Sequence, residues 1–222
     1  MIPYHNGDVY EGELLDRRPH GRGKMMYCRR PGSDLKNPDY TSSNCTTYDG
    51  DWVNGSRCLK GKLAWADGSV YRGEHADDNM GGHGKISFIN GDVYKGEWSD
   101  DMFNGYGKLT EATGDVYVGN FVDDLADGQG TMTYANGSVY EGHWSEDNRH
   151  GHGKMAYVDG GVYEGDWVED AATGTGKMIY CNGDVYEGGW KIDKFHGKGR
   201  FKRAKGDVYS GQWHEDDLIS GH

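Results

Sequence analysis

Hydrophobic and polar residues alternate along short runs that recur through the whole chain. The run Val-Tyr-Glu-Gly-His-Trp at 139–144 and the run Gly-Lys-Met-Ala-Tyr at 153–157 both have a period of two. A period of two is typical of β-strands, and the Gly, Asn and Asp residues between the runs are typical of turns. Each pair of runs therefore predicts one β-hairpin. No segment has a helical period over enough residues to pack on such hairpins.

The hairpins form a repeat. The tripeptide Tyr-x-Gly begins at Tyr10, Tyr48, Tyr71, Tyr94, Tyr117, Tyr140, Tyr163, Tyr186 and Tyr209. The interval is constant from Tyr48 onward, and the first interval, from Tyr10 to Tyr48, is longer. The pattern predicts one array over residues 1–222, made of about nine 23-residue hairpins that start near these tyrosines. The extra residues of the first interval predict a loop insertion at 28–47 between the first two repeats.

Alternation also predicts the faces of the sheet. Tyr, Gly and Trp of the first strand share one face, and charged residues share the other. We expect Tyr to lie opposite the second-strand aromatic, Trp opposite the second-strand Gly, and Met opposite the first-strand Gly. We expect acids three residues after the Tyr to lie opposite a basic residue. A two-residue turn between repeats would break this alternation, so a three-residue turn or a bulge is needed. The predicted fold is all-β: a single-layer antiparallel β-hairpin solenoid, elongated and twisted.

Composition agrees with a fold of this kind. Leu, Ile, Val and Phe make up only about 14% of the chain, too little for a two-layer aliphatic core. Aromatic residues reach 13%, and Gly numbers 38 against 4 Pro, which argues against disorder and against a Pro/Gly linker. The chain must fold around aromatic residues and glycine.

The recurring pattern Tyr-x-Gly-x-Trp followed by Gly-x-Gly-x-x-x-Tyr-x-Asn-Gly resembles the MORN (membrane occupation and recognition nexus) repeat. The resemblance implies a stretched β-hairpin solenoid that acts as a scaffold in cilia and flagella, the cytoskeleton or membrane junctions. It implies partner helices or segments bound along a groove, frequent dimers, and proposed binding of phosphoinositides. The chain departs from the pattern at Leu59, Lys60, Glu111 and Arg203.

An uncovered aromatic face predicts a groove that receives a partner helix or extended segment. Its predicted residues are Trp98, Tyr117, Tyr140, Trp144, Tyr163, Trp167, Tyr186 and Trp190. The same aromatics are also the only core available to the fold. The ninth repeat stops at His222 and offers an edge strand for a homodimer or larger assembly.

No catalytic constellation, cofactor site or metal site is predicted. Gly-x-Gly stands at a strand start without a following helix, so it is no nucleotide fingerprint. Paired loop acids such as Asp77-Asp78 and Asp100-Asp101 lack calcium-loop spacing and predict a solvated ridge along one edge. The repeats occupy the whole chain, so we expect no enzyme. The predicted function is a non-catalytic protein-interaction scaffold, cytoskeletal or ciliary/flagellar.

Basic residues gather at the two ends of a chain whose net charge is −12. The candidate contacts for an anionic surface are Arg17, Arg18, Arg29, Arg30, Lys198, Arg200, Lys202 and Arg203. They allow an alternative function, a phosphoinositide-binding membrane tether, beside ordinary solvated loops. A second alternative is a regulatory subunit of a separate enzyme. The net charge disfavours broad membrane adsorption and argues against nucleic acid.

No long apolar run and no basic, apolar leader is visible, so an intracellular location, cytoplasm or cytoskeleton, is expected. The four cysteines, Cys28, Cys45, Cys58 and Cys181, show no C-x-x-C spacing. We expect free thiols in a reducing compartment.

Overall fold

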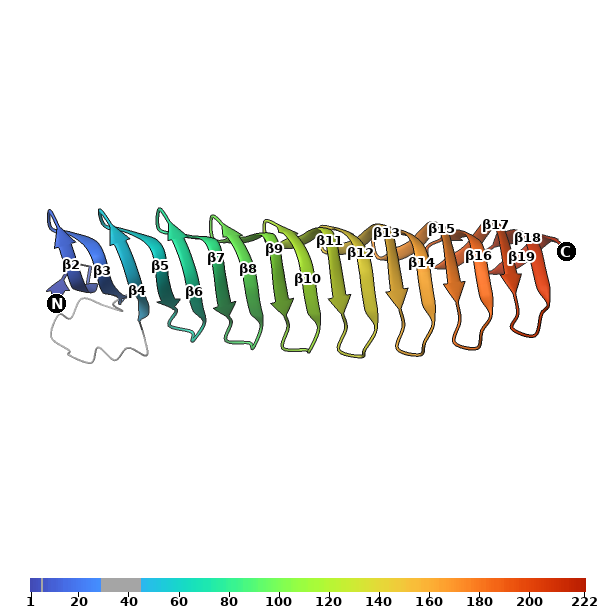
Figure 1. Ribbon diagram of the computed structural model, residues 1–222, viewed down its shortest axis with the longest axis horizontal. Coiled ribbons are helices and arrows are strands. Elements are labelled where there is room, and N and C mark those ends of the chain that lie inside the picture. The colour runs from blue at the N-terminus through green and yellow to red at the C-terminus, as the bar shows by residue number, and fades with distance from the viewer. Residues whose placement is uncertain (5, 29–44) are drawn as a thin grey trace. The chain divides into compact units, whose positions relative to one another are not determined.

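The computed structural model of the chain describes residues 1–4, 6–28 and 45–222. Contacts between Cα atoms divide the chain into unit 1 (Met1–Ala112) and unit 2 (Thr113–His222). The described residues form 19 strands and no helix. Adjacent strands within each unit pair antiparallel in chain order, as the β-hairpin solenoid requires (Figure 1).

Unit 1 contains β1 (Ile2–Pro3), β2 (Val9–Leu15), β3 (Arg18–Tyr27), β4 (Thr46–Val53), β5 (Ser56–Ala64), β6 (Val70–Ala76), β7 (Asn79–Ser87), β8 (Val93–Ser99) and β9 (Met102–Thr110). Unit 2 contains β10 (Val116–Val122), β11 (Leu125–Thr133), β12 (Val139–Ser145), β13 (Asn148–Ala156), β14 (Val162–Val168), β15 (Ala171–Ile179), β16 (Val185–Lys191), β17 (Lys194–Lys202), β18 (Val208–His214) and β19 (Asp217–Gly221). Each even-numbered strand from β2 onward forms a hairpin with the strand after it.

The register within a hairpin differs from the expected one by two residues. Tyr140 lies opposite Met155 instead of Tyr157, and Gly142 lies opposite Gly153. A two-residue shift keeps every side chain on its expected face, so the alternation alone could not reveal it. The expected partner of Lys was wrong for the same reason: Lys24 lies opposite Glu11 and Asp49, not opposite Glu13.

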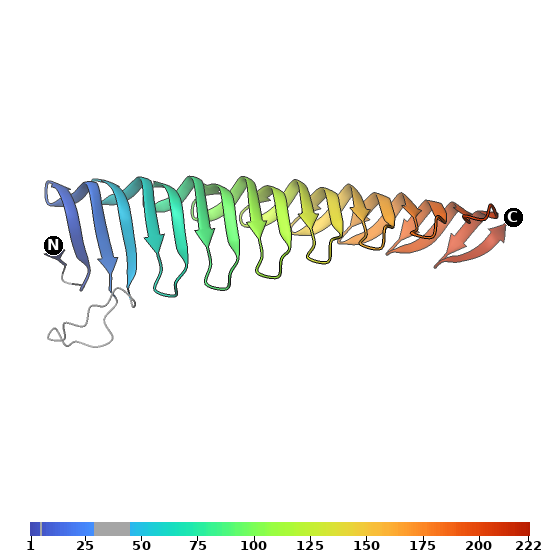
Figure 2. The same cartoon turned by 60° about the horizontal axis from the view of Figure 1, so that its bottom comes forward.

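The paired glycines explain the register. A Cβ on Gly153 would lie 2.2 Å from the hydroxyl oxygen of Tyr140, and a Cβ on Gly142 would lie 2.6 Å from the same atom. The Tyr ring therefore covers two bare backbones at once, which only glycine allows at such close approach. The register shifts beside this pair, between Gly142 and His143, so a bulge lies inside the hairpin, where none was expected. The connection between repeats, where the irregularity was expected, is a turn over residues 157–161 between β13 and β14. Figure 2 shows the strands bending over toward the edge with the short turns.

Each hairpin closes with two residues of positive φ, such as Glu146 (47°) and Asp147 (66°). Two successive positive values define a type I′ turn, whose twist matches that of the strands. Asn-Gly usually occupies such turns, whereas most turns here carry acidic residues. Asp tolerates this conformation better than most residues because its short side chain can form local hydrogen bonds.

The second turn residue links consecutive hairpins. The Asp147 backbone N–H donates to the carbonyl of Ala126 (3.0 Å), and its Oδ1 accepts the Ala126 N–H (2.7 Å). We call this pair of bonds the turn clasp; it recurs at Asp78, Asp101, Asp170, Asp193 and Asp216. The clasp aspartates are exposed at this edge, except for the half-exposed Asp78, as the predicted ridge requires. Their carboxylates also bind the backbone of the preceding repeat, a role that the sequence did not reveal.

A second acceptor links repeats at the opposite edge. Oδ1 of Asp184, two residues before Tyr186, accepts the N–H of Ala204 (2.8 Å). The same contact is made by Asp8, Asp92 and Asp115, and by the hydroxyl oxygens of Ser69 and Ser138. Gly161 occupies this position in the repeat of Tyr163 and carries no acceptor.

Cys28 and Cys45 form a disulfide, so the expectation of four free thiols was wrong for this pair. The pairing of β3 with β4 explains the bond. Tyr27, the last residue of β3, lies opposite Thr46, the first residue of β4. Cys28, which follows Tyr27, and Cys45, which precedes Thr46, therefore lie side by side. Cys58 and Cys181 are free thiols. Most of the predicted insertion, including Arg29 and Arg30, lies outside the described residues.

Candidate functional site

The inner face of each unit, which carries the Tyr, Gly and Trp of the first strand, is an aromatic ladder. In unit 2, Trp167 stands edge-on between Tyr140 and Tyr163, with ring centroids 5.4 and 5.0 Å apart. Trp144 and Trp190 are placed in the same way between successive tyrosines, and Trp213 stands edge-on to Tyr186. Edge-to-face pairs at this separation are stabilising beyond the area that they bury.

In unit 2, backbone carbonyls accept hydrogen bonds from the tyrosine hydroxyls and indoles of the ladder. In unit 1, the buried indole nitrogen of Trp98 has no partner among the described residues. The Tyr140 hydroxyl donates to the carbonyl of His143 (2.9 Å), three residues along the same strand. The Trp167 indole donates to the carbonyl of Gly153 (3.2 Å). Burial raises the pKa of Tyr140 to about 12, so this hydroxyl stays a proton donor at neutral pH. The ladder is built as a core.

The eight predicted groove residues are all buried, and none exposes more than 8% of its surface. Within each unit they lie on the inner face, where their side chains pack against one another and leave no open groove between them. Partner contact would therefore fall on the side chains around them. The nearest are the second-strand aromatics, which end the Gly-x-Gly-x-x-x-Tyr run of each repeat.

These second-strand aromatics form a more accessible row. Tyr157 is 38% exposed, and Tyr134 and Tyr180 are half-buried in the same repeat position of unit 2. Met132 and Met178, two residues before Tyr134 and Tyr180, are also half-buried. In unit 1, Tyr27 and Trp65 line two cavities of about 500 and 510 Å³, and Cys28 of the disulfide lines the second. Sequence reasoning did not select this row, although its regular recurrence was visible.

The ladder of unit 1 is interrupted at His75, which stands in the Trp position between Tyr48 and Tyr71. Its ring is buried, and both ring nitrogens lack a partner among the described residues. Burial, together with the guanidinium of Arg57, lowers its pKa to about 4. Leu59, opposite His75, has a φ of 51° where other repeats place Gly. The departure at Leu59 is thus a strained backbone position.

The predicted anionic contacts lie at exposed positions where described. Arg17 and Arg18 lie at the first hairpin turn, and Lys198 and Lys202 lie on β17. Arg200 lies opposite Glu187, and the Arg203 guanidinium is 5.4 Å from the ring of Tyr209. Contact of these ends with anionic headgroups stays a prediction.

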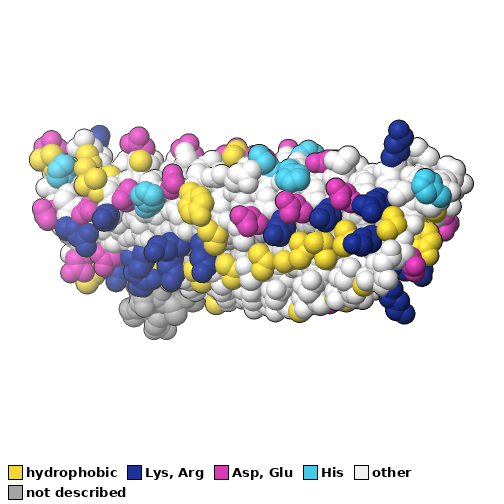
Figure 3. Space-filling model, turned by 45° about the vertical axis from the view of Figure 1, so that its right-hand side comes forward, with side chains coloured by type: hydrophobic (Ala, Val, Ile, Leu, Met, Phe, Trp, Pro, Cys, Tyr) yellow, Lys and Arg dark blue, Asp and Glu magenta, His cyan; other side chains and the backbone are white. Residues whose placement is uncertain are grey.

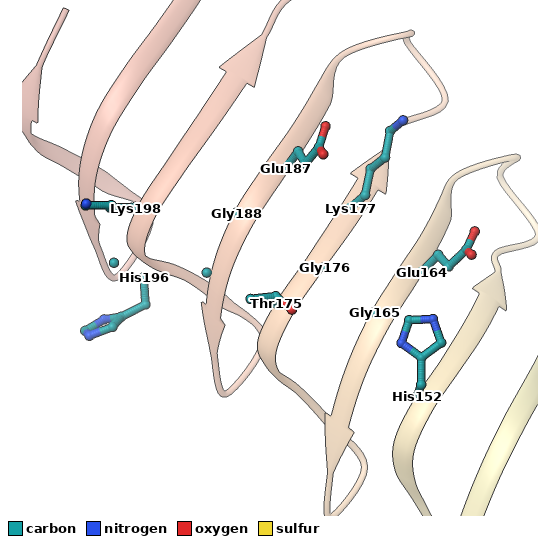
Figure 4. Close-up of a pocket in the computed structure, with 12 residues that line it drawn as sticks. His152, Glu164, Gly165, Thr175, Gly176, Lys177, Glu187, Gly188, His196 and Lys198 are labelled. Carbon is teal, nitrogen blue, oxygen red and sulfur yellow. The ribbon is translucent and has the colours of Figure 1, made fainter.

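The outer face, which carries the charged residues, has a shallow hollow of about 560 Å³ in unit 2. Backbone at Gly165, Gly176 and Gly188 lines it, and Figure 4 shows Glu164, Lys177 and Glu187 standing on successive strands beside these glycines. The described residues hold no group of three or more His, Cys, Asp or Glu side chains placed to bind a metal. Within the same residues, no helix is long and apolar enough to cross a membrane.

Comparison with protein families gives a match over most of the chain. The model of the MORN repeat matches residues 10–29, 48–70, 71–93, 94–116, 117–139, 140–162, 163–185 and 186–208. The chain belongs to the MORN-repeat family. The family model thus confirms eight of the expected repeats. Comparison with curated protein sequences finds no relative.

Solved structures resemble this MORN array in fold. The TCP10 domain of Danio rerio CPAP, solved with a peptide of Danio rerio STIL, has a TM-score of 0.50 at 12% identity. That match covers 93% of this chain and 84% of the TCP10 chain. The TCP domain of SAS-4 (dCPAP) from Drosophila melanogaster, in complex with a proline-rich motif of Ana2, has a TM-score of 0.43 at 12% identity. It covers 70% of this chain and 85% of the other.

Proposed function

We propose that this MORN-repeat chain is a non-catalytic protein-interaction scaffold that binds a helix or extended segment of a partner along its inner face. The observation that carries the proposal is the recurring half-exposed aromatic row of Tyr134, Tyr157 and Tyr180 in unit 2. Half-exposed aromatic side chains on a rigid sheet offer large contact area at low entropic cost. The buried ladder beneath holds them in place.

Two further points support the proposal. The MORN family implies scaffolds of the cytoskeleton, cilia and flagella, and we propose such a location for this chain. The TCP10 domain of similar fold was solved together with a peptide of another protein, so a sheet of this kind can present a peptide-binding surface. The fold is shared at 12% identity, so the partner itself does not carry over.

A photo-cross-linking residue at Tyr157 tests the site directly. The matched control carries the same residue at His152, which is exposed on the outer face of β13. We expect Tyr157, and not His152, to capture a defined segment of a partner from native extract, identified by mass spectrometry.

The captured segment would then be synthesised and titrated by calorimetry. Tyr134→Ala/Tyr157→Ala should weaken its binding at least tenfold, whereas the outer-face variant Thr175→Ala should leave it unchanged. Capture at both positions alike, or equal affinity for both variants, would overturn the inner face as the binding site.

A further inference from the structure

Unit 1 carries five positive charges in succession on the outer face of strands β5 to β9, whereas the same positions on β2 to β4 alternate as Glu11, Lys24 and Asp49. Lys62, Arg72, Lys85, Lys95 and Lys108 lie directly opposite one another on the five consecutive strands from β5 to β9. We call these residues the cationic row. All five are exposed, and none forms an ion pair with a carboxylate in the described part of the chain. Figure 3 shows Lys and Arg gathered in one continuous group.

The same repeat positions in unit 2 alternate in sign. Glu141, Lys154, Glu164, Lys177, Glu187 and Arg200 lie opposite one another from β12 to β17. We call these residues the alternating row; Figure 3 shows such an alternation of blue and magenta side chains. Two residues make the difference. Arg72 and Lys95 stand directly after the repeat Tyr, where the alternating row has Glu.

Like charges directly opposite one another on paired strands are destabilising. The row contains four such contacts in succession and spans roughly 19 Å at the usual strand spacing of about 4.8 Å. Opposite charges at these positions would stabilise the sheet, as the pairing in unit 2 illustrates. A stability cost that a two-residue change would remove points to a ligand that neutralises the row.

The surroundings of the row restrict the shape of that ligand. Acidic turns lie at both ends of the strands: Asp67 and Asp77 are each five residues from Arg72, roughly 17 Å along an extended strand. This exceeds the screening length of about 8 Å at physiological ionic strength, so these acids do not neutralise the row. A broad anionic surface would meet them, whereas a narrow ligand lying across the strands would not.

Three carboxylates lie closer. Asp49 on β4 lies directly opposite Lys62, at the first end of the row. The other two, Glu74 and Glu97, lie on the same face, two residues along their strands from Arg72 and Lys95. Glu97 Oε1 accepts the backbone N–H of Tyr106 (3.2 Å), and Glu74 Oε2 points at the backbone of Gly82. Both are turned toward a neighbouring strand, and Lys60 lies opposite Glu74. The five cations thus dominate this part of the outer face. Tyr106, which is 58% exposed, lies two residues from Lys108 on the same face. It is a single ring at one end of the row and does not form the succession of rings on which single-stranded nucleic acid stacks.

We propose that the cationic row binds an acidic polypeptide segment that lies across strands β5 to β9 on the outer face of unit 1. An extended segment of about six residues spans roughly the length of the row. This surface lies on the outer face of unit 1, whereas the aromatic row of the proposed function lies on the inner face of unit 2.

The test is a titration of the full chain with a fluorescently labelled octaglutamate peptide, followed by anisotropy at low and high salt. We expect saturable binding by the natural chain that weakens as salt rises. Arg72→Glu/Lys95→Glu, which restores the alternation, should weaken binding at least tenfold. The matched control Lys198→Glu/Lys202→Glu makes the same change in net charge at the C-terminal basic end and should alter affinity less than twofold.

Circular dichroism would verify the fold, and Arg72→Gln/Lys95→Gln serves as a milder second variant. Equal losses in the row variant and the control would show a response to net charge alone and overturn the site. Failure of the natural chain to bind octaglutamate would overturn it as well. Vesicles of phosphatidylcholine and phosphatidylserine in a four-to-one ratio, and an oligothymidylate, would be titrated in parallel. Tighter row-dependent binding of either would overturn the polypeptide as ligand.

Discussion

The two units are built from the same repeat, yet they use it differently. Unit 2 has an alternating charge row on its outer face, and on its inner face Trp144, Trp167, Trp190 and Trp213 form a ladder without a gap. Unit 1 has five like charges in succession, a buried His75 in a Trp position and Leu59 in a Gly position. Each of these three features lowers the stability of unit 1, and the repeat does not require any of them.

The comparison of the two units separates residues that stabilise the fold from residues that lower its stability and whose presence the fold does not explain. Unit 2 shows what the repeat looks like when local preference, packing and charge agree. Departures that lower stability without a visible gain within the chain concentrate where function is expected. Unit 1 is therefore the first place to seek a ligand on the outer face, and unit 2 is the reference for every substitution made there.

The largest effect is expected from breaking the regular ladder at Trp167→Ala. Trp167 is 2% exposed, donates to Gly153 and lies 4.4 Å below the guanidinium of Arg149. Its removal should lower the free energy of unfolding by about 3–5 kcal/mol. Urea titration followed by circular dichroism measures the loss, with the exposed Val168→Ala as control. A loss below about 1 kcal/mol would show that the ladder is not the core.

The irregular ladder of unit 1 should make the chain sensitive to acid through His75. Its folded pKa of about 4 lies below the ordinary value of 6.5, so the unfolded chain takes up the proton first. Stability from this group is full above pH 6.5 and falls between pH 6.5 and 4, by on the order of 3 kcal/mol at most. His75→Trp should remove this part of the pH dependence.

Urea titrations at pH 7 and pH 4.5 compare the two proteins. We expect Trp to fit at position 75, because all complete repeats from Tyr117 onward have Trp or Phe four residues after the Tyr. The same acid-induced loss in His75→Trp and in the natural chain would assign the sensitivity to other groups.

Exchanging the two charge rows should move stability in opposite directions. Arg72→Glu/Lys95→Glu turns four like-charge contacts into four opposite-charge contacts and should stabilise unit 1 by about 1–2 kcal/mol at low salt. Glu141→Arg/Glu164→Lys should destabilise unit 2 by a similar amount. Both shifts should shrink at high salt, measured by thermal unfolding. A row variant that is less stable than the natural chain would remove the argument that the cationic row carries a stability cost.

The hairpins and the two faces of the sheet could be predicted from the sequence, but the register between strands could not. Period-two alternation and the regular repeat predict the hairpins and place Tyr140, Gly142 and Trp144 on one face. They leave the register open, because a two-residue shift preserves both faces. The Tyr ring resolves it by covering two glycines at once, a packing constraint that appears only in three dimensions.

The candidate surfaces depended on that register. Arg72 and Lys85 lie on different strands, and they become neighbours only when the residue after Tyr lies opposite the residue after the second Gly. The burial of Trp98 and its equivalents depends likewise on the bend at the glycine pair, which alternation does not encode. The Cys28–Cys45 disulfide could have been predicted, because the two cysteines flank the connection between two neighbouring strands, and the ends of paired strands lie close together.

The turn clasps occur in both units and should contribute equally to the stability of each. Measuring one clasp therefore gives a stability contribution that the two units share, which can be set aside when they are compared. Asp193→Ala deletes the acceptor for the Ala172 N–H (2.8 Å) and should cost about 1 kcal/mol. Asp193→Gly removes the same acceptor but suits the positive φ of 61°, so it separates hydrogen bonding from backbone strain. Asp193→Asn keeps an acceptor and should be nearly neutral in thermal unfolding. Equal stability of all three variants would show that the clasp contributes nothing.

The smallest expected effect is a gain, at the one place where unit 2 lacks an acceptor that its other repeats supply. Gly161 takes the position of Ser138, whose hydroxyl accepts the N–H of Val158 (3.1 Å), and the corresponding donor here is Cys181. A Cβ on Gly161 would lie 3.1 Å from Asp159 Oδ1 and 3.2 Å from the flexible end of Met178, and both side chains can shift. Gly161→Ser should therefore raise the free energy of unfolding by about 0.5–1 kcal/mol. Gly161→Ala adds the Cβ without the acceptor. An equal gain in both variants would therefore show that the gain comes from the lower conformational entropy of the unfolded backbone and not from the hydrogen bond.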